Sequence, residues 1–211
     1  MMPLERVTIM ADNKYYITIG RQHGCGGRLV GKDLADRLGI QYYDRDSVID
    51  MISDDCGLTP DAVAGLMERR TSSLLYEMAT LGQTNPLEEQ VFISKTRIVN
   101  KLADQSSFVI VGVCGDYILR ERENLLRVFL YDDPKNRINR IINVYHDTDY
   151  LTEQQLKSMD RNRADYYRFF TSYKWGNRNN YDLLMNTNVG LDTVTDMLEL
   201  IAKKRFGGLH Q

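Results

Sequence analysis

Residues 15–46 read YYITIGRQHGCGGRLVGKDLADRLGIQYYDRD, and this stretch decides the fold. It opens with YYITIG, a β-branched and aromatic run that predicts a buried strand over residues 15–20. A glycine-containing loop, RQHGCGG, follows at once. The next segment, RLVGKDLADRLG, places Val30 and Leu34 on one helical face and ends in glycine, which predicts a helix. A second short strand over residues 40–43 completes a β-α-β unit, the building block of a parallel sheet.

The rest of the chain alternates between helix and strand patterns. An acidic loop at residues 44–46 leads into a region of helical pattern over residues 47–105. Further strands are expected at 108–112, 126–131 and 182–186, and further helices at 60–81, 87–102, 116–122, 134–145, from 152 onward and at 191–204. We therefore expect an α/β fold with a parallel five-stranded sheet flanked by helices.

Composition narrows the classes of protein to which the chain can belong. Its 211 residues suit one domain, and 43% hydrophobic with 27% charged residues is the balance of an ordinary soluble protein rather than a disordered one. A formal net charge of -2 argues against a polycation that binds nucleic-acid polymers. No apolar run approaches the roughly 18 residues of a membrane span. We expect neither a nucleic-acid polymer nor a membrane as a partner, and a homo-oligomer stays open.

Cysteine usage and the first residues of the chain favour a cytoplasmic localisation. Cys25, Cys56 and Cys114 are odd in number and lack metal-binding spacing, which suggests reduced thiols. The start, MMPLERVTIMADNK, has no long apolar core and does not resemble a secretory signal. We expect residues 1–14 to form a loose N-terminus.

The glycine loop carries the strongest chemical signal. Gly24, Gly26 and Gly27 follow a buried strand, so their backbone N–H groups can point inward, and the next helix adds its positive N-terminal dipole. This combination predicts a phosphate cradle. The loop departs from the G-x-x-x-x-G-K-[ST] pattern, because Gly27 stands at the lysine position and the next residues offer no hydroxyl for magnesium. Either Arg21 or Arg28 would supply the missing charge; the alternative is a β-α turn that uses glycine for tight geometry alone.

A second signal is a group of arginines late in the chain. Arg161, Arg163 and Arg168 lie in DRNRADYYR, where Arg161 and Arg168 share a helical face and Arg163 points elsewhere. Taken alone, they favour a solvated amphipathic helix. Beside a phosphate cradle they favour phosphoryl transfer, which positive groups catalyse by neutralising charge on the moving phosphoryl.

Three segments of the chain resemble the cytidylate kinase-like family. ITIGRQHGCGGRLVGKDLADRLGIQYYDRD resembles the family's N-terminus, with its S-R-E-F-G-S-G-G-R loop and Y-D-R turn. FVIVGVCGDYILRERENLLRVFLYDDP is similar to the G-R-C-x-D-Y-x-L segment and the following strand. DRNRADYYRFFTSYKWGNRNNYDLLMNT resembles the lid, K-W-G and Y-D-L motifs. The resemblance covers most of residues 15–201, and the motifs occur in order.

The resemblance implies a nucleoside-monophosphate-kinase-like P-loop fold. We expect a single domain over residues 15–205, in which residues 47–105 form a helical acceptor region and residues 147–180 form a lid region. Residues 206–211 would be a C-terminal tail.

The resemblance also implies roles for individual residues. The donor phosphates would be bound by Arg21, Gly24, Cys25, Gly26, Gly27 and Arg28. The acceptor would be bound by Asp44, Arg45, Asp116 and Arg120. The catalytic arginines of the lid would be Arg161, Arg163 and Arg168. ATP and Mg²⁺ are the implied cofactors, and Asp44 is the implied metal contact. For Asp116 the simpler role, a first-turn acid that only begins a short helix, stays open.

Two departures from the family pattern affect these roles. Val113 occupies the position of an arginine that helps to bind the acceptor phosphate in the cytidylate kinases proper, so cytidine monophosphate is in doubt as the acceptor, and another arginine would have to supply the lost charge. Candidates for that charge are Arg45, Arg120 and Arg122. In the loop, Gln22, His23 and Cys25 replace Glu, Phe and Ser of the family pattern. Cys25 is either a thiol of lowered pKa at the helix N-terminus or a small residue that fits the turn.

The sequence leads to two main hypotheses of function and one weaker alternative. The first is a phosphotransferase that moves a phosphoryl group from ATP or a similar nucleotide to a small acceptor, most plausibly a nucleoside monophosphate such as CMP. The second is a catalytically inactive nucleotide-binding or regulatory protein that keeps the fold. A bare structural or interaction domain would require the glycine loop to be only a turn.

Overall fold

Five parallel strands form one sheet in the order β2-β3-β1-β4-β5 in the computed structural model, which describes residues 14–68 and 86–207. The strands are β1 (Tyr16–Arg21), β2 (Gln41–Tyr43), β3 (Phe108–Val111), β4 (Leu125–Tyr131) and β5 (Leu183–Asn186). The helices are α1 (Gly27–Leu38), α2 (Arg45–Cys56), α3 (Pro60–Glu68), α5 (Pro86–Gln105), α6 (Gly115–Ile118), α7 (Pro134–Arg140), α8 (Glu153–Thr171) and α9 (Leu191–Phe206). The expected parallel five-stranded sheet flanked by helices is confirmed.

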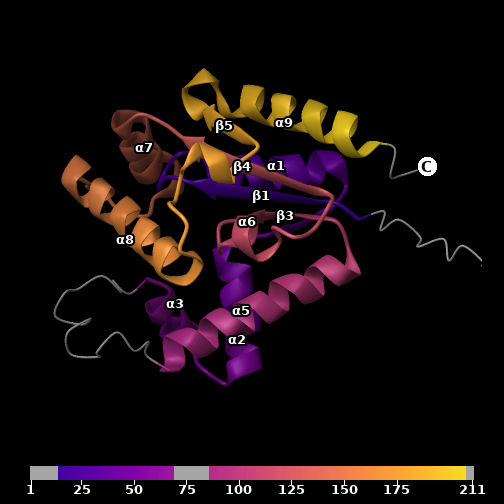
Figure 1. The fold of residues 1–211 in the computed structure, drawn as a ribbon. Coiled ribbons are helices and arrows are strands. Elements are labelled where there is room, and N and C mark those ends of the chain that lie inside the picture. The colour runs from indigo at the N-terminus through magenta and orange to yellow at the C-terminus, as the bar shows by residue number, and fades with distance from the viewer. Residues whose placement is uncertain (1–13, 69–85, 208–211) are drawn as a thin grey trace, which may run out of the picture.

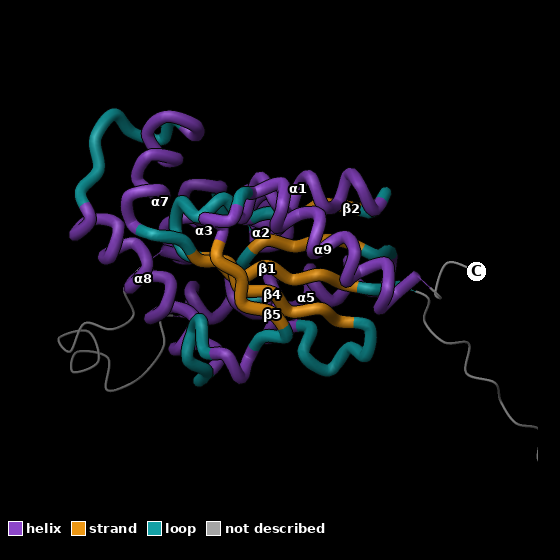
Figure 2. Tube along the Cα trace, turned by 90° about the horizontal axis from the view of Figure 1, so that it is seen from above, coloured by secondary structure: helices purple, strands orange, loops and turns teal. Residues whose placement is uncertain are grey.

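Helices cover both faces of the sheet. Figures 1 and 2 show α1 and α9 side by side on one face, where their apolar sides pack on alternate residues of the strands. On the other face, α2, α3 and α5 pack together below α6 (Figure 1). Strands that are covered on both faces must be apolar throughout, and the fully buried Phe108–Val111 of β3 is of this kind.

The carboxyl ends of the strands all lie at one edge of the sheet, because the strands are parallel. Here β1 continues into the glycine loop, β2 into α2, and β3 into α6. Helices α7 and α8 lie beside this edge, at the left of Figure 1. Open parallel sheets bind ligands at this edge, so a ligand-binding site is expected here.

The backbone after β3 is strained. Gly112, Val113 and Cys114 have successive φ angles of 81°, 49° and 60°, in the left-handed region. Glycine adopts this conformation freely, whereas a β-branched valine does so only at a cost in energy. Strain of this kind persists where the surrounding structure fixes it and often lies at functional sites.

Three local expectations differ from the structure. Residues 45 and 46 belong to the first turn of α2 rather than to a loop, because the Asp44 side chain caps that helix. Helix α6 ends at Ile118 instead of continuing to residue 122, since the N–H groups of Arg120 and Arg122 bond to carbonyls three residues earlier and tighten the chain into turns. The expected helix at 60–81 is seen as α3 up to Glu68, and its remainder lies outside the described residues.

Within the described part of the chain, every helix is too short or too polar to cross a bilayer.

Candidate active site

The glycine loop joins β1 to α1 at the carboxyl edge of the sheet. Gly24 and Gly26 have φ angles of 76° and 95°, so both positions favour glycine. Gly26 is the N-cap of α1 and makes no side-chain capping bond. The N–H groups of Gly26, Gly27 and Arg28 make no backbone hydrogen bond within residues 14–68 and 86–207. The N–H groups of Gly26 and Arg28 remain available to an anion at the positive end of the helix, while that of Gly27 also interacts with the Cys25 thiol.

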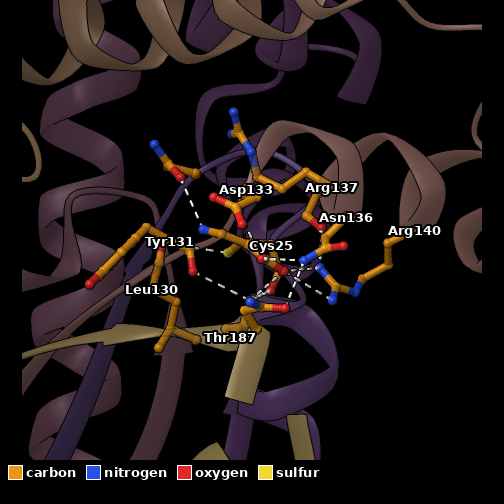
Figure 3. A network of polar contacts seen from close by, with 12 residues as sticks. Cys25, Leu130, Tyr131, Asp133, Asn136, Arg137, Arg140 and Thr187 are labelled. Atoms are coloured by element: carbon orange, nitrogen blue, oxygen red, sulfur yellow. Dashed lines mark hydrogen bonds and ion pairs between the residues drawn. The ribbon is translucent and has the colours of Figure 1, made fainter. Parts of the chain in front are cut away.

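The carbonyl groups of the loop are bound from outside. Arg137 Nη1 donates to His23 O at 3.2 Å, and Arg140 Nη1 donates to Gly24 O at 2.7 Å. Thr187 Oγ1 donates to Cys25 O at 2.8 Å. Figure 3 shows Arg140 of α7 and Thr187 of the segment after β5 close to Cys25 of the loop. The loop carbonyls are thus engaged by these donors, and the loop residues line a cavity.

The buried carboxylate of Asp132, directly after β4, connects two of these donors, Thr187 and Arg140. It accepts hydrogen bonds from Thr187 Oγ1 at 2.9 Å, Asn136 Nδ2 at 3.0 Å and Asp133 N at 2.8 Å, and it forms an ion pair with Arg140 at 3.3 Å. Burial alone would raise the pKa of Asp132, but these hydrogen bonds lower it on balance. Asp132 therefore stays ionised and fixes the arginine and threonine that bind the loop.

His23 connects the loop to α8. Its backbone N–H donates to Asp160 Oδ1 at 2.8 Å, while Asp160 Oδ2 pairs with the buried Arg137 at 2.6 Å. Arg163 Nη2 lies 2.8 Å from His23 Nδ1, and since a guanidinium only donates, Nδ1 is the acceptor. Burial, followed by the charge of Arg163, lowers the pKa of His23 to about 3. The imidazole is therefore neutral near pH 7.

Two adjoining cavities open at this edge of the sheet. The smaller, of about 210 Å³, is lined by the whole glycine loop, by Asp44–Asp46 and by Tyr145 and Asp147, and we call it the donor cavity after the role that the sequence predicts for the loop. The larger, of about 360 Å³, is lined by Val113, Asp116, Trp175 and several tyrosines and methionines, and we call it the acceptor cavity after the role predicted for Asp116. Four side chains line both cavities: Arg21, His23, Arg45 and Arg163. Three of the four are arginines, so positive charge is concentrated at the junction.

Arg163 is the one predicted catalytic arginine at this junction. Burial, then the charge of Arg21, lowers its pKa to about 9, so it still carries a positive charge near pH 7. Arg161 and Arg168 are exposed on α8 and line neither the donor nor the acceptor cavity. The structure thus brings together Arg163 and the glycine loop and leaves Arg161 and Arg168 outside.

Asp116 is buried in the wall of the acceptor cavity. Tyr167 Oη donates to its Oδ2 at 2.7 Å, and burial raises the pKa of the carboxyl group. Arg120 is more remote: it lines a further cavity of about 220 Å³ with Asp116, donates to Tyr117 O at 2.8 Å and pairs with Glu121. Of the four predicted acceptor residues, Asp116 and Arg45 line the acceptor cavity.

Asp44 is the predicted metal contact and lines the donor cavity. Its Oδ1 accepts from Ser47 N at 3.0 Å and Ser47 Oγ at 3.1 Å, and these bonds cap α2. Its Oδ2 has one long contact, 3.5 Å to Tyr42 Oη. Asp44 can therefore offer one carboxylate oxygen to a magnesium ion or to a water on it. No cluster of three or more metal-binding side chains occurs among the described residues, so phosphate oxygens and water would supply the other ligands.

The Cys25 side chain points away from the cradle. Its thiol is buried and lies 3.5 Å from Leu130 O, and burial raises its pKa to about 11. The expectation of a lowered thiol pKa at this position is wrong, because the desolvation of Cys25 outweighs the opposing effects of the Gly27 N–H and of nearby arginines. Cys25 contributes backbone and small size to the loop.

Reasoning from the sequence missed the residues that hold the loop from behind. These are Asp132, Arg137, Arg140, Asp160 and Thr187. Arg137 and Arg140 are three residues apart in the helix that begins at Pro134, so they lie on one helical face. This spacing is the sequence signal that could have indicated a shared role. No local pattern marked Thr187, whose role depends on β5 lying next to β4.

Comparisons with known proteins identify the family and the fold of the chain. The model of the cytidylate kinase-like family matches residues 16–189. A search of curated proteins gives no significant match. Among solved structures, the fold is similar to an uncharacterized protein from Eubacterium ventriosum, with 25% identity, a TM-score of 0.65 and coverage of 90% of this chain and 99% of that one.

Known kinases share the fold at lower identity. Shikimate kinase from Acinetobacter baumannii, in complex with shikimate, has 18% identity, a TM-score of 0.50 and coverage of 90% of this chain and 94% of its own. A gluconokinase from Sinorhizobium meliloti has 12% identity, a TM-score of 0.52 and coverage of 93% and 95%. At these identities the likeness concerns the fold alone.

Proposed function

The chain belongs to the cytidylate kinase-like family, and from that membership we propose that it is a phosphotransferase. It moves the terminal phosphoryl group of ATP or a similar nucleotide from the donor cavity to a small acceptor in the adjoining acceptor cavity. The observation that carries this proposal is the arrangement of the loop. Its carbonyls are bound by Arg137, Arg140 and Thr187, and its residues line a cavity at whose inner end three arginines converge.

The chemistry requires mainly positioning and positive charge. Phosphoryl transfer passes through a transition state whose charge is spread over the phosphoryl oxygens, so fixed cations near those oxygens lower the barrier. Arg21, Arg45 and Arg163 lie where the two cavities meet, which is where the phosphoryl group would pass from donor to acceptor. His23, neutral and hydrogen-bonded to Arg163, orients that arginine.

Magnesium, when bound, would bridge the donor phosphates and neutralise part of their charge. Asp44 Oδ2 is the carboxylate oxygen through which this chain would contact the ion or its water.

The acceptor that we propose is a small molecule of the size of a nucleoside monophosphate, with CMP as the first candidate. The aromatic rings of Tyr166, Tyr167 and Trp175 in the acceptor cavity suit a flat base, and Asp116 suits a group that donates hydrogen bonds. Val113 lines the same cavity and cannot bind a phosphate. Arg45, at the junction, is the arginine placed to bind the acceptor phosphate instead.

The alternative function is that of a nucleotide-binding regulatory protein without turnover. It is favoured by the missing lysine and by the missing hydroxyl, since Gly27 and Arg28 stand at those positions.

A turnover assay separates the two functions. ADP release from Mg·ATP is measured with the full chain, alone and with CMP, UMP, AMP, GMP or shikimate. We expect at least one acceptor to accelerate ADP release by more than tenfold. ATP binding without acceptor-dependent release from any of these compounds would support the regulatory alternative.

A further inference from the structure

The glycine loop exchanges two residue types relative to the P-loop signature. In G-x-x-x-x-G-K-[ST], a glycine stands five residues before the last glycine, and a lysine follows that last glycine directly. With Gly26 as the last glycine, this chain has Arg21 at the first glycine position and Gly27 at the lysine position. The positively charged side chain therefore stands at the first position of the loop, residue 21, instead of directly after its last glycine, at residue 27.

The Arg21 stem lies across Gly27. A β-carbon built on Gly27 would stand 2.9 Å from Arg21 Cγ, closer than real β-carbons approach other atoms, and 3.1 Å from Arg21 Cβ, which is also a tight contact. Gly27 has an ordinary helical backbone, so its φ angle does not call for glycine. Glycine at this position is explained by the arginine stem that crosses it, since any lysine here would begin with the same clash.

The Arg21 guanidinium ends against Gly112. A β-carbon on Gly112 would lie 1.8 Å from Arg21 Nη1 and 2.6 Å from Arg21 Cζ. The φ angle of Gly112 is 81°, and it begins the strained turn that continues through Val113 and Cys114. The turn after β3 thus leaves a space that the guanidinium fills. Two glycines far apart in the sequence make room for one side chain.

This placement brings an uncompensated charge to the junction of the cavities. Arg21 lines both cavities, and its side chain forms no hydrogen bond or ion pair with the described residues. Burial lowers the pKa of Arg21, and the charges of Arg45 and Arg28 lower it further, against opposing contributions from Cys25 and Tyr42. A cluster of arginines of this kind is stabilised by an anion that binds among them.

Arg28, the other candidate for the missing charge, is engaged elsewhere. It is exposed, pairs with Asp147 at 3.4 Å and stacks over the Tyr145 ring with Cζ 4.5 Å from the centroid. These partners hold it at the outer mouth of the donor cavity, away from the junction.

We infer that Arg21 takes over the role of the P-loop lysine, with its guanidinium placed by Gly27 and Gly112 to bind the phosphoryl group that passes between the two cavities. The inference rests on the proposed phosphotransferase function. A lysine extends inward from the start of α1, whereas Arg21 reaches the same space from the end of β1. Its planar fork can bind two phosphoryl oxygens at once, which a lysine ammonium does not do.

The test restores the residue types of the P-loop signature at positions 21 and 27. Four variants of the full chain are compared with wild type: Arg21→Met, Arg21→Gly, Gly27→Lys, and the double variant Arg21→Gly with Gly27→Lys. Arg21→Met keeps a stem over Gly27 and removes the charge. Arg97→Met, an exposed arginine on α5 paired with Asp55, is the matched control. The readouts are Mg·ATP affinity by calorimetry, turnover with the acceptor found for the wild type, and melting temperature without ligand.

We expect Arg21→Met to melt near wild type and to lose about 100-fold or more in turnover, the scale of removing one transition-state donor. Gly27→Lys alone should be impaired, because its stem meets Arg21, and the double variant should recover at least tenfold over Arg21→Gly. Arg97→Met should match wild type. If the wild type turns over and Arg21→Met is unimpaired, or if the double variant is no more active than Arg21→Gly, the inferred role of Arg21 is wrong. The proposed function would not be affected by that result. A wild type that does not bind Mg·ATP would overturn the proposed function as well.

Discussion

The His23 side chain shows how the site sets the protonation of one residue. Burial and four nearby arginines, Arg163 first among them, lower its pKa to about 3, and its Nδ1 accepts a hydrogen bond from Arg163. A histidine beside a phosphate site is often taken for a cation. Here the imidazole stays neutral and acts as an acceptor that orients an arginine.

This depressed pKa makes stability depend on pH in a defined direction. The unfolded chain protonates His23 near pH 6.5, whereas the folded chain does so only near pH 3, so acid favours unfolding between these values. We expect the free energy of unfolding of wild type to fall from pH 7.5 to pH 5 by up to about 2 kcal/mol more than that of His23→Asn. Chemical denaturation at the two pH values measures this difference.

Asn is the matched replacement, because its Oδ1 can still accept from Arg163 while the group no longer titrates. Equal losses of stability in wild type and His23→Asn on acidification would show that His23 is not held neutral.

At the scale of elements, α8 is attached to the loop through Asp160. This carboxylate accepts from His23 N and pairs with Arg137, whose side chain is buried and also donates to His23 O. The three groups join α7, α8 and the glycine loop into one polar unit. Loss of the Asp160 charge would leave a buried guanidinium without its counter-ion.

We expect Asp160→Asn to lower the free energy of unfolding by about 3 kcal/mol, because breaking one partner of a buried ion pair is costly. The Asn side chain keeps an acceptor for His23 N, so the loss reports the charge. Urea denaturation measures it. Glu153→Gln, on the same helix with an exposed partner in Lys157, is the control and should change stability by less than about 1 kcal/mol. A similar small change for both variants would contradict the coupling.

The elements themselves could be predicted well from the sequence. The run YYITIG, the glycine at the end of α1 and the Thr152 cap of α8 each carry a local signal, and all three are found where expected within one residue. The first turn of α2 was mistaken for a loop, because the Asp44 cap with Ser47 at the third helical position was not recognised in DRDS. Cap geometry is local, so this miss was avoidable.

For the whole molecule, the sequence could indicate the loop but not the surroundings that make it a site. The junction of the two cavities draws residues from β1, α2 and α8, and only the order β2-β3-β1-β4-β5 brings their ends together. The direction of Arg163 into the site, and of Arg161 and Arg168 away from it, depends on how α8 packs at the carboxyl edge. Periodicity on α8 alone gives no such direction.

The strained turn after β3, at Gly112 to Cys114, also depends on the whole fold. Val113 stands where the family pattern has an arginine, and it follows Gly112, whose lack of a side chain leaves room for the Arg21 guanidinium. Gly27, which departs from the P-loop signature, and Val113, which departs from the family pattern, are thus both related to Arg21: its stem crosses Gly27, and it lines the acceptor cavity together with Val113.

The central claim is that the glycine loop and its arginines bind the phosphates of a nucleoside triphosphate. Calorimetric titration of the full chain with Mg·ATP, with adenosine and with inorganic triphosphate tests it most directly. We predict that Mg·ATP binds one to one and at least about 100-fold more tightly than adenosine, that inorganic triphosphate competes with it, and that affinity falls as salt is raised. Absence of Mg·ATP binding, or equal binding of adenosine and ATP, would contradict the claim.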